Sequence, residues 1–201
     1  MKMRLTFARA VALLSMVSST RGQGTFVYDQ QSVNTSVPAG ILDDIQPNEP
    51  IGQSFTPSLS AVGFVRLNLS DAITRNGVGA AVYVNLRTDS ITGPVLGSTD
   101  PVSMPDNFDG LADFLFSAPV PVTAGATYYL QPVVLAGDTW RVGVFLGDRY
   151  PSGTEYYQGA VLQNFDFWFR EGVVVPEPGS AWLLLVGIGG LSYAHRLRLR
   201  S

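Results

Sequence analysis

The chain has 201 residues, among them 13 basic residues, 16 acidic residues, one histidine and no cysteine. The absence of cysteine excludes thiol catalysis and Cys-ligated zinc, and the length suits one folded domain. Residues 23–174 hold 15 of the acidic residues and six of the basic ones, so this body carries a net charge of −9, which argues against nucleic-acid binding.

Residues 1–22 have the pattern of a secretory signal peptide. The basic residues Lys2 and Arg4 precede the largely apolar residues 10–17, and small and polar residues follow up to Gly22. The apolar run is too short to span a bilayer, which needs about 20 residues. We expect cleavage after Gly22. The alternative is an N-terminal amphipathic helix that belongs to the fold.

Residues 23–174 have the pattern of short β-strands. Apolar and polar residues alternate with a period of two, and turn-forming Gly, Pro, Asn and Asp separate the segments. This body contains no convincing amphipathic helix of 12 residues. The pattern predicts an all-β fold, a single β-sandwich of the jelly-roll type, with an edge or a bulge at Pro132. The expected strands include residues 62–69, 81–87, 127–135, 140–146 and 165–170.

The residue types in the body leave little means of catalysis. The single histidine, His195, lies outside it, and it contains no lysine, so a Ser-His-Asp triad, a histidine metal site and Schiff-base chemistry are all excluded. Carboxylates remain, and a pair of them could support glycoside hydrolysis, but no spacing singles out such a pair. We therefore expect the protein not to be an enzyme, with a carboxylate-based glycosidase as a distant alternative.

Aromatic residues are the remaining candidates for ligand binding. In the strand predicted at residues 165–170, Asp166, Trp168 and Arg170 share one face, and Phe residues occupy the other. If the Phe face is buried, Trp168 lies in a groove beside a carboxylate and a guanidinium, a combination typical of sugar-binding sites. Tyr156 and Tyr157 could line the same groove. The alternative is that both faces of the strand are buried.

Calcium is the metal that best suits the remaining side chains. Asp106, Asn107 and Asp109 place three oxygen-bearing side chains within four residues, without the spacing of an EF-hand. Such a cluster also forms turns through hydrogen bonds from side chain to backbone. We expect no cofactor, with structural calcium at this turn as the alternative.

Residues 175–201 form three unlike segments in succession. A Pro-Glu-Pro sequence holds the backbone extended, residues 181–194 are uncharged and apolar, and residues 195–201 are basic. The apolar segment is short for a transmembrane helix, and the positive flank would stay cytoplasmic. The residues that define the ends of this tail are Pro176, Glu177, Pro178, Arg196, Arg198 and Arg200.

This ending closely resembles the PEP-CTERM sorting signal. The resemblance implies that an exosortase in the cytoplasmic membrane recognises Pro176, Glu177 and Pro178, that residues 181–194 hold the chain in that membrane, and that the three arginines act as a basic stop. Residues 52–57, 86–96 and 166–172 are more loosely similar to secreted sandwich domains that accompany such tails. The alternative is a plain single-span anchor.

These observations predict an exported structural or adhesion protein of the cell surface or the extracellular matrix. It would be held briefly in the membrane before exosortase processing. The alternative function is a carbohydrate-binding module that binds extracellular polysaccharide through the groove near Trp168.

Overall fold

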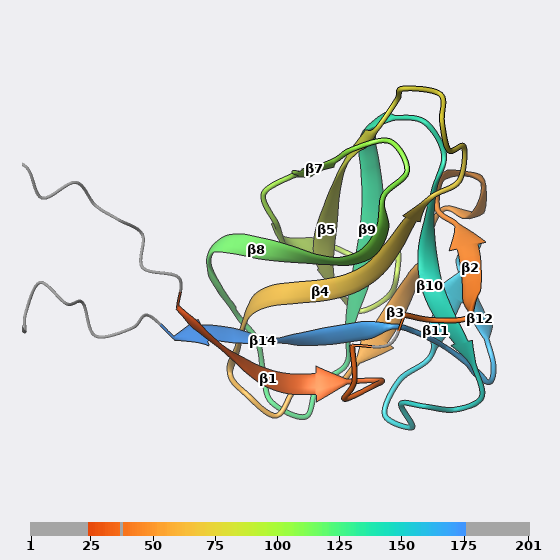
Figure 1. Cartoon of the computed structure of the whole chain (residues 1–201). Helices are drawn as coiled ribbons and strands as arrows, with labels where there is room; N and C mark the ends of the chain where they lie inside the picture. The colour runs from red at the N-terminus through yellow and green to blue at the C-terminus, as the bar shows by residue number, and fades with distance from the viewer. Residues whose placement is uncertain (1–23, 37, 176–201) are drawn as a thin grey trace, which may run out of the picture. The chain divides into compact units, whose positions relative to one another are not determined.

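The computed structural model describes residues 24–36 and 38–175, of which Phe26–Val175 form one compact unit. Two seven-stranded antiparallel sheets, which we call sheet A and sheet B, make up this unit (Figure 1). Sheet A consists of β1 (Thr25–Gln31), β2 (Ile41–Asp44), β4 (Ala61–Asp71), β8 (Asp109–Pro121), β10 (Trp140–Leu146), β13 (Phe165–Phe167) and β14 (Phe169–Val175). Sheet B consists of β3 (Gly52–Phe55), β5 (Ala80–Thr88), β6 (Val95–Ser98), β7 (Val102–Met104), β9 (Tyr128–Gly137), β11 (Glu155–Tyr157) and β12 (Ala160–Leu162).

The core lies between the two sheets, as the alternating pattern requires. On β5, Val82, Val84 and Leu86 are fully buried, and the residues between them face outward or make polar contacts. Large side chains from both sheets meet there, including Phe55 and Trp140. Each such side chain stabilises the fold by roughly 1.5–3 kcal/mol through the apolar surface it buries. The predicted all-β sandwich is confirmed, and the one helical element in the described part is a 3₁₀ turn at Gln46–Asn48.

The segment predicted as one strand at residues 165–170 is divided at Trp168. Before the division, Phe167 pairs with Val144 of β10; after it, Phe169 pairs with Leu67 of β4. Trp168 joins the two parts by donating its backbone N–H to the Gly143 carbonyl at 2.7 Å. The chain therefore changes its neighbouring strand within sheet A at this residue, which a simple alternation of faces does not predict.

Pro132 lies in β9, where it pairs with Val84 of β5. The recorded pairing of β9 with β3 on its other side ends at Leu130. A proline has no N–H to donate, so it suits a position where one neighbour has ended. The edge predicted at Pro132 agrees with this arrangement. The bulge, given as the other option, lies further along β9, where the pairing with β5 shifts opposite residues 81 and 82.

The two ends of the body emerge together. Strands β1 and β14 run side by side in sheet A, and the start of one lies beside the end of the other (Figure 1). Within residues 24–36 and 38–175, no helix has the length and apolar character needed to cross a membrane. The helix predicted at residues 181–194 and the signal peptide predicted at residues 1–22 lie outside the described residues.

Candidate functional site

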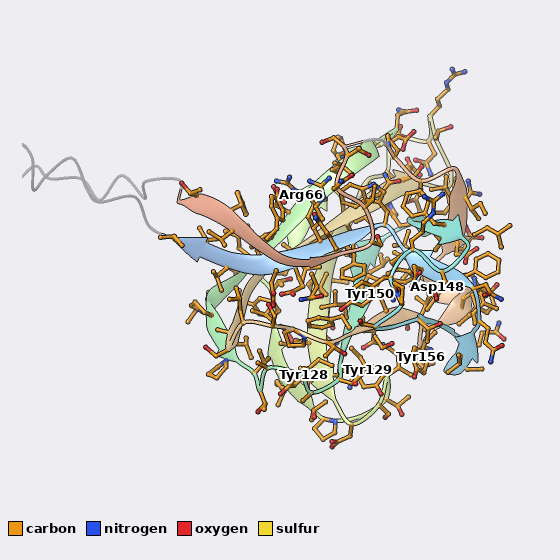
Figure 2. The ribbon with its side chains drawn as sticks, turned by 90° about the horizontal axis from the view of Figure 1, so that it is seen from below. Arg66, Tyr128, Tyr129, Asp148, Tyr150 and Tyr156 are labelled. Atoms are coloured by element: carbon orange, nitrogen blue, oxygen red, sulfur yellow. The ribbon has the colours of Figure 1, made fainter. Side chains whose placement is uncertain are left out.

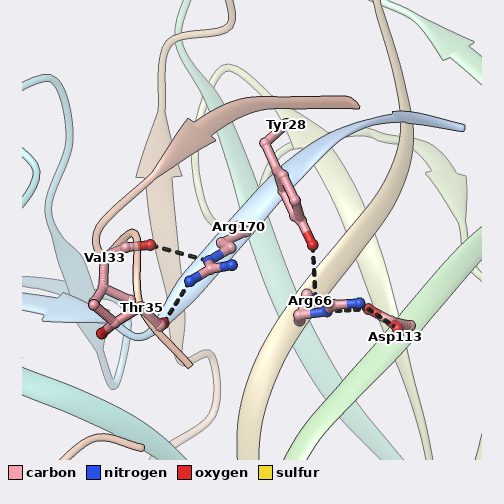
Figure 3. A network of polar contacts seen from close by, with 6 residues as sticks. All are labelled: Tyr28, Val33, Thr35, Arg66, Asp113 and Arg170. Atoms are coloured by element: carbon pink, nitrogen blue, oxygen red, sulfur yellow. Dashed lines mark hydrogen bonds and ion pairs between the residues drawn. The ribbon is translucent and has the colours of Figure 1, made fainter. Parts of the chain in front are cut away.

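Trp168 is fully buried, so the predicted sugar-binding groove at this ring is absent from the structure. The Arg170 guanidinium lies 5.0 Å from the centre of the Trp168 ring and 5.3 Å from that of Tyr28. It also donates hydrogen bonds to the carbonyls of Val33, at 3.0 Å, and Thr35, which hold the segment after β1 over the strand (Figure 3). Both faces of this strand are therefore buried.

A second arginine stabilises the same region of sheet A. Arg66 of β4 makes a two-pronged ion pair with Asp113 of β8, at 2.5 and 2.7 Å, and donates to the Tyr28 hydroxyl at 2.7 Å (Figure 3). The hydrogen bond to Asp113 raises the pKa of the Arg66 guanidinium. These contacts link three strands of one sheet, and we assign them a structural role.

Asp166, another predicted ligand-binding residue, supports a loop from inside. Its side chain is 1% exposed. One carboxylate oxygen accepts the backbone N–H groups of Arg149 and Tyr150, at 2.8 and 2.9 Å, and the other accepts the Gln53 amide at 2.9 Å. Burial raises the pKa of the Asp166 carboxyl, while its N–H donors oppose that shift. The loop between β10 and β11 is thereby fixed.

This loop forms one wall of an open cleft of about 270 Å³, which we call the Asp148 cleft. Three exposed polar side chains line it: Asp148, Gln163 and Asn164. None of the three makes a side-chain hydrogen bond to any other residue of the described body. Figure 2 shows the labelled Asp148 and Tyr150 on this side of the molecule. The remaining lining residues are Gly153, Thr154, Val161, Phe165 and Asp166.

The two predicted tyrosines lie next to this cleft but on different faces of β11. Tyr156 is half-buried and its ring contacts Tyr129 of β9 edge to face, with ring centres 5.4 Å apart (Figure 2). It also lies directly opposite Val161, a residue of the cleft, in the pairing of β11 with β12. Tyr157 instead packs against the core. Of the predicted ligand-binding residues, Tyr156 therefore keeps a ring near an open surface.

Sequence reasoning missed Glu155, the most strongly perturbed acid of the described body. Its side chain is fully buried, and neither carboxylate oxygen has a hydrogen-bond donor among the residues that the structure describes. Glu155 instead interacts with another carboxyl, that of Asp43 on β2 in the opposite sheet. Burial first, and then the charges of Asp43 and Asp166, raise the pKa of Glu155 to about 9. Glu155 is therefore protonated at neutral pH and can donate that proton to Asp43.

Glu171 of β14 forms a similar carboxyl pair with Asp29 of β1. It is fully buried, and one of its oxygens accepts the backbone N–H of Gln30 at 3.0 Å. Burial and the nearby Asp29 raise its pKa to about 8. Glu155 and Glu171 could have been noticed in the sequence as acidic residues at inward-facing strand positions. Their partners, Asp43 and Asp29, could not, because each lies more than 100 residues away in the chain.

The residues predicted to bind calcium organise turns in the structure. The Asp106 carboxylate accepts the backbone N–H groups of Arg75 and Gly77, each at 2.8 Å, and these bonds lower its pKa. The backbone N–H of Asn107 donates to Asp71, and Asp109 pairs with Ser70 at the start of β8. Among residues 24–36 and 38–175, no group of three or more His, Cys, Asp or Glu side chains is placed to hold a metal ion. Calcium at this turn stays a prediction.

One protein-family model matches the C-terminal tail. The model of the PEP-CTERM protein-sorting motif matches residues 174–198. The chain carries a PEP-CTERM protein-sorting motif at these residues. The match supports export, transient membrane anchoring and exosortase-dependent sorting to the surface. The matched residues from Pro176 onward lie outside the described part of the chain. No curated protein matches the chain.

Proposed function

We propose that this PEP-CTERM protein delivers a non-enzymatic β-sandwich to the cell surface or the extracellular matrix, where it serves as a structural or adhesion component. The observation that carries the proposal is the sorting motif at residues 174–198. Residues 1–22 direct export, and the apolar residues 181–194 then hold the chain while exosortase acts. The basic residues 195–201 stay on the cytoplasmic side, as the positive-inside rule predicts.

The chemistry of the body supports a role without catalysis. Residues 23–174 contain no His, Lys or Cys, which leaves carboxyls and tyrosine hydroxyls as the side chains able to transfer protons. Glu155 and Glu171, whose pKa values are raised furthest, are enclosed in the sandwich and have no exposed surface to offer a substrate. A general acid must come within hydrogen-bonding reach of the group it protonates. We therefore attribute both residues to the fold.

Sorting is tested with Glu177→Ala in the native host. We expect the variant body to fold normally but to accumulate in the membrane fraction, whereas the wild-type chain reaches the surface with a mass that lacks part of the tail. Asp100→Ala is the matched control, since it removes one exposed acid that makes no side-chain hydrogen bond to the rest of the described body. Surface material that retains residues 181–201, or normal sorting of Glu177→Ala, would overturn exosortase processing through this motif.

A carbohydrate-binding role is the second candidate. The observation that favours it is the Asp148 cleft with its three unengaged polar side chains, which takes the place of the groove expected at Trp168. Clefts lined by a few polar groups beside apolar side chains are typical of small-molecule sites. On this candidate the body binds a polysaccharide at the surface to which the tail sends it.

A further inference from the structure

We propose that the Asp148 cleft and the Tyr129–Tyr156 ring pair form one binding site for an uncharged saccharide. This inference rests on the carbohydrate-binding candidate, and it names the site and the chemical class of the ligand. Three features support it: the hydrogen-bonding groups in the cleft, the rings beside the cleft, and the sign of the charge around it.

The cleft offers the groups that sugar hydroxyls need. The carboxylate of Asp148 accepts hydrogen bonds, and the side-chain amides of Gln163 and Asn164 both donate and accept. Adjacent hydroxyls of a sugar ring have the same dual character, so these three side chains can bind them without deprotonation. The half-buried ring of Phe165 provides an apolar wall for the C–H face of the sugar. The volume of about 270 Å³ lies just below the range of roughly 300–1,000 Å³ for small-molecule sites, which suits one sugar unit.

The cleft is already organised in the free protein. Asp166 fixes the backbone on the C-terminal side of Asp148 through the N–H groups of Arg149 and Tyr150. On the other side, the N–H of Gly147 donates to the carbonyl of Asn164 at 2.7 Å, which ties the two walls together. A site held in its binding geometry loses less conformational entropy when a ligand arrives.

The tyrosine pair extends the site along the outer surface of sheet B. Val161 lines the cleft and lies directly opposite Tyr156, so their side chains share one face, with Cβ atoms about 4.5–5.5 Å apart. The next ring, Tyr129, contacts Tyr156 edge to face, and both rings are half-buried (Figure 2). Tyrosine combines an apolar ring with a hydroxyl, which suits a second sugar unit beyond the one in the cleft.

Charge selects against acidic sugars. The charged residues among those that line the cleft are Asp148 and Asp166, both acidic. The neighbouring Arg149 directs its guanidinium elsewhere, to 5.4 Å from the centre of the Phe145 ring. The body as a whole carries more than twice as many acidic as basic residues. These carboxylates would repel a uronate or sulfate group, which would find no cation in the cleft to pair with. A neutral hexose carries no charge and is not repelled.

The test is binding of the purified full-length chain, in mild detergent, to an array of neutral gluco-, manno-, galacto- and xylo-oligosaccharides beside oligomers of alginate and polygalacturonate. We expect at least one neutral series to bind and both acidic series to fail. Asp148→Ala should weaken that binding about tenfold or more, because a hydrogen bond to a charged group contributes about 1.5–3 kcal/mol. Tyr156→Ala should shorten the preferred oligosaccharide, because it removes the second sugar position.

The control is Asp100→Ala, which makes the same change of charge at an exposed residue beyond the opposite edge of sheet B. It should bind as the wild type does. Asp148→Ala should keep its fold because the side chain is exposed and has no hydrogen bond to the rest of the described body. Binding that is confined to the acidic series, equal binding by Asp148→Ala and wild type, or no binding to any series would each overturn this inference. None of these outcomes affects the sorting experiment with Glu177→Ala. The saccharide site and exosortase-dependent sorting can therefore be refuted independently of each other.

Discussion

Replacement of Glu155 by Gln should change how the stability of the body depends on pH. The folded state holds a proton on Glu155 up to about pH 9, whereas the unfolded chain releases it near the ordinary value of 4.5. Between these values the folded state binds more protons than the unfolded state, so the stability that Glu155 contributes is fully present below about pH 4.5 and is lost as pH rises toward 9. Gln keeps the shape of the protonated acid and still offers an N–H to Asp43, but it does not titrate.

The magnitude follows from the number of such groups. Each carboxyl that is protonated when folded and ionised when unfolded lowers the free energy of unfolding by about 1.4 kcal/mol per pH unit. Glu171, with a pKa of about 8, adds an equal slope over most of the same range. From pH 5.5 to 7.5 the two residues together should therefore remove about 5 kcal/mol, and Glu155→Gln should reduce this loss by half.

Urea denaturation of the full-length chain, followed by tryptophan fluorescence at several pH values, measures this slope. Asp100→Asn, an acid-to-amide change at an exposed position, should leave the wild-type slope unchanged. The two curves for wild type and Glu155→Gln should diverge steadily as pH rises above 5. Parallel curves would show that Glu155 is ionised in the folded state, and the reasoning from its burial would then be refuted.

Three further substitutions test the packing by the same denaturation assay. Trp168→Ala should cost about 3–5 kcal/mol, because it opens a large cavity beneath Arg170, and a cost below about 1 kcal/mol would contradict the observed burial. Gly52→Ala should cost about 1–3 kcal/mol, because its Cβ would clash with the Leu130 carbonyl oxygen and with Ile91 Cδ1; Gly40→Ala, with open space around it, is the control. Asp113→Ala should cost about 1 kcal/mol or less, and the cost should shrink in high salt because the ion pair with Arg66 is partly exposed.

Local pattern was enough to predict the fold class and the principal strands. The alternation in residues 62–69 and 81–87 corresponds to β4 and β5, because one face of each strand packs against the core, and in β4 most of the other face is buried as well. Short strands such as β2, β11 and β12 have three or four residues, too few for a period to be recognised. Their places are set by pairing with distant strands, which the local sequence does not encode.

The candidate site was only partly predictable for the same reason. The alternating pattern predicts that one face of the strand at residues 165–170 is exposed, and Trp168 lies on that face. In the structure the segment after β1 covers this face, and Arg170 holds the segment through two backbone carbonyls. Tyr156 was identified from its residue type. Asp148, Gln163 and Asn164 were not, because three ordinary polar loop residues become a cleft only when two loops meet. The carboxyl pair of Glu155 and Asp43 likewise joins residues from opposite sheets.

The position of β14 also determines how the body would bear a mechanical load. This strand ends at Val175, directly before the Pro-Glu-Pro sequence, and it lies between β1 and β4 (Figure 1). A pull on the C-terminal end of β14 that is directed along the strand would load the backbone hydrogen bonds on both of its edges together, in shear. An edge strand pulled from its end in the perpendicular direction would instead lose its bonds one after another. In the surface role proposed above, a sandwich tethered through this strand would be held by a central strand of sheet A, which suits it to withstand flow along that direction.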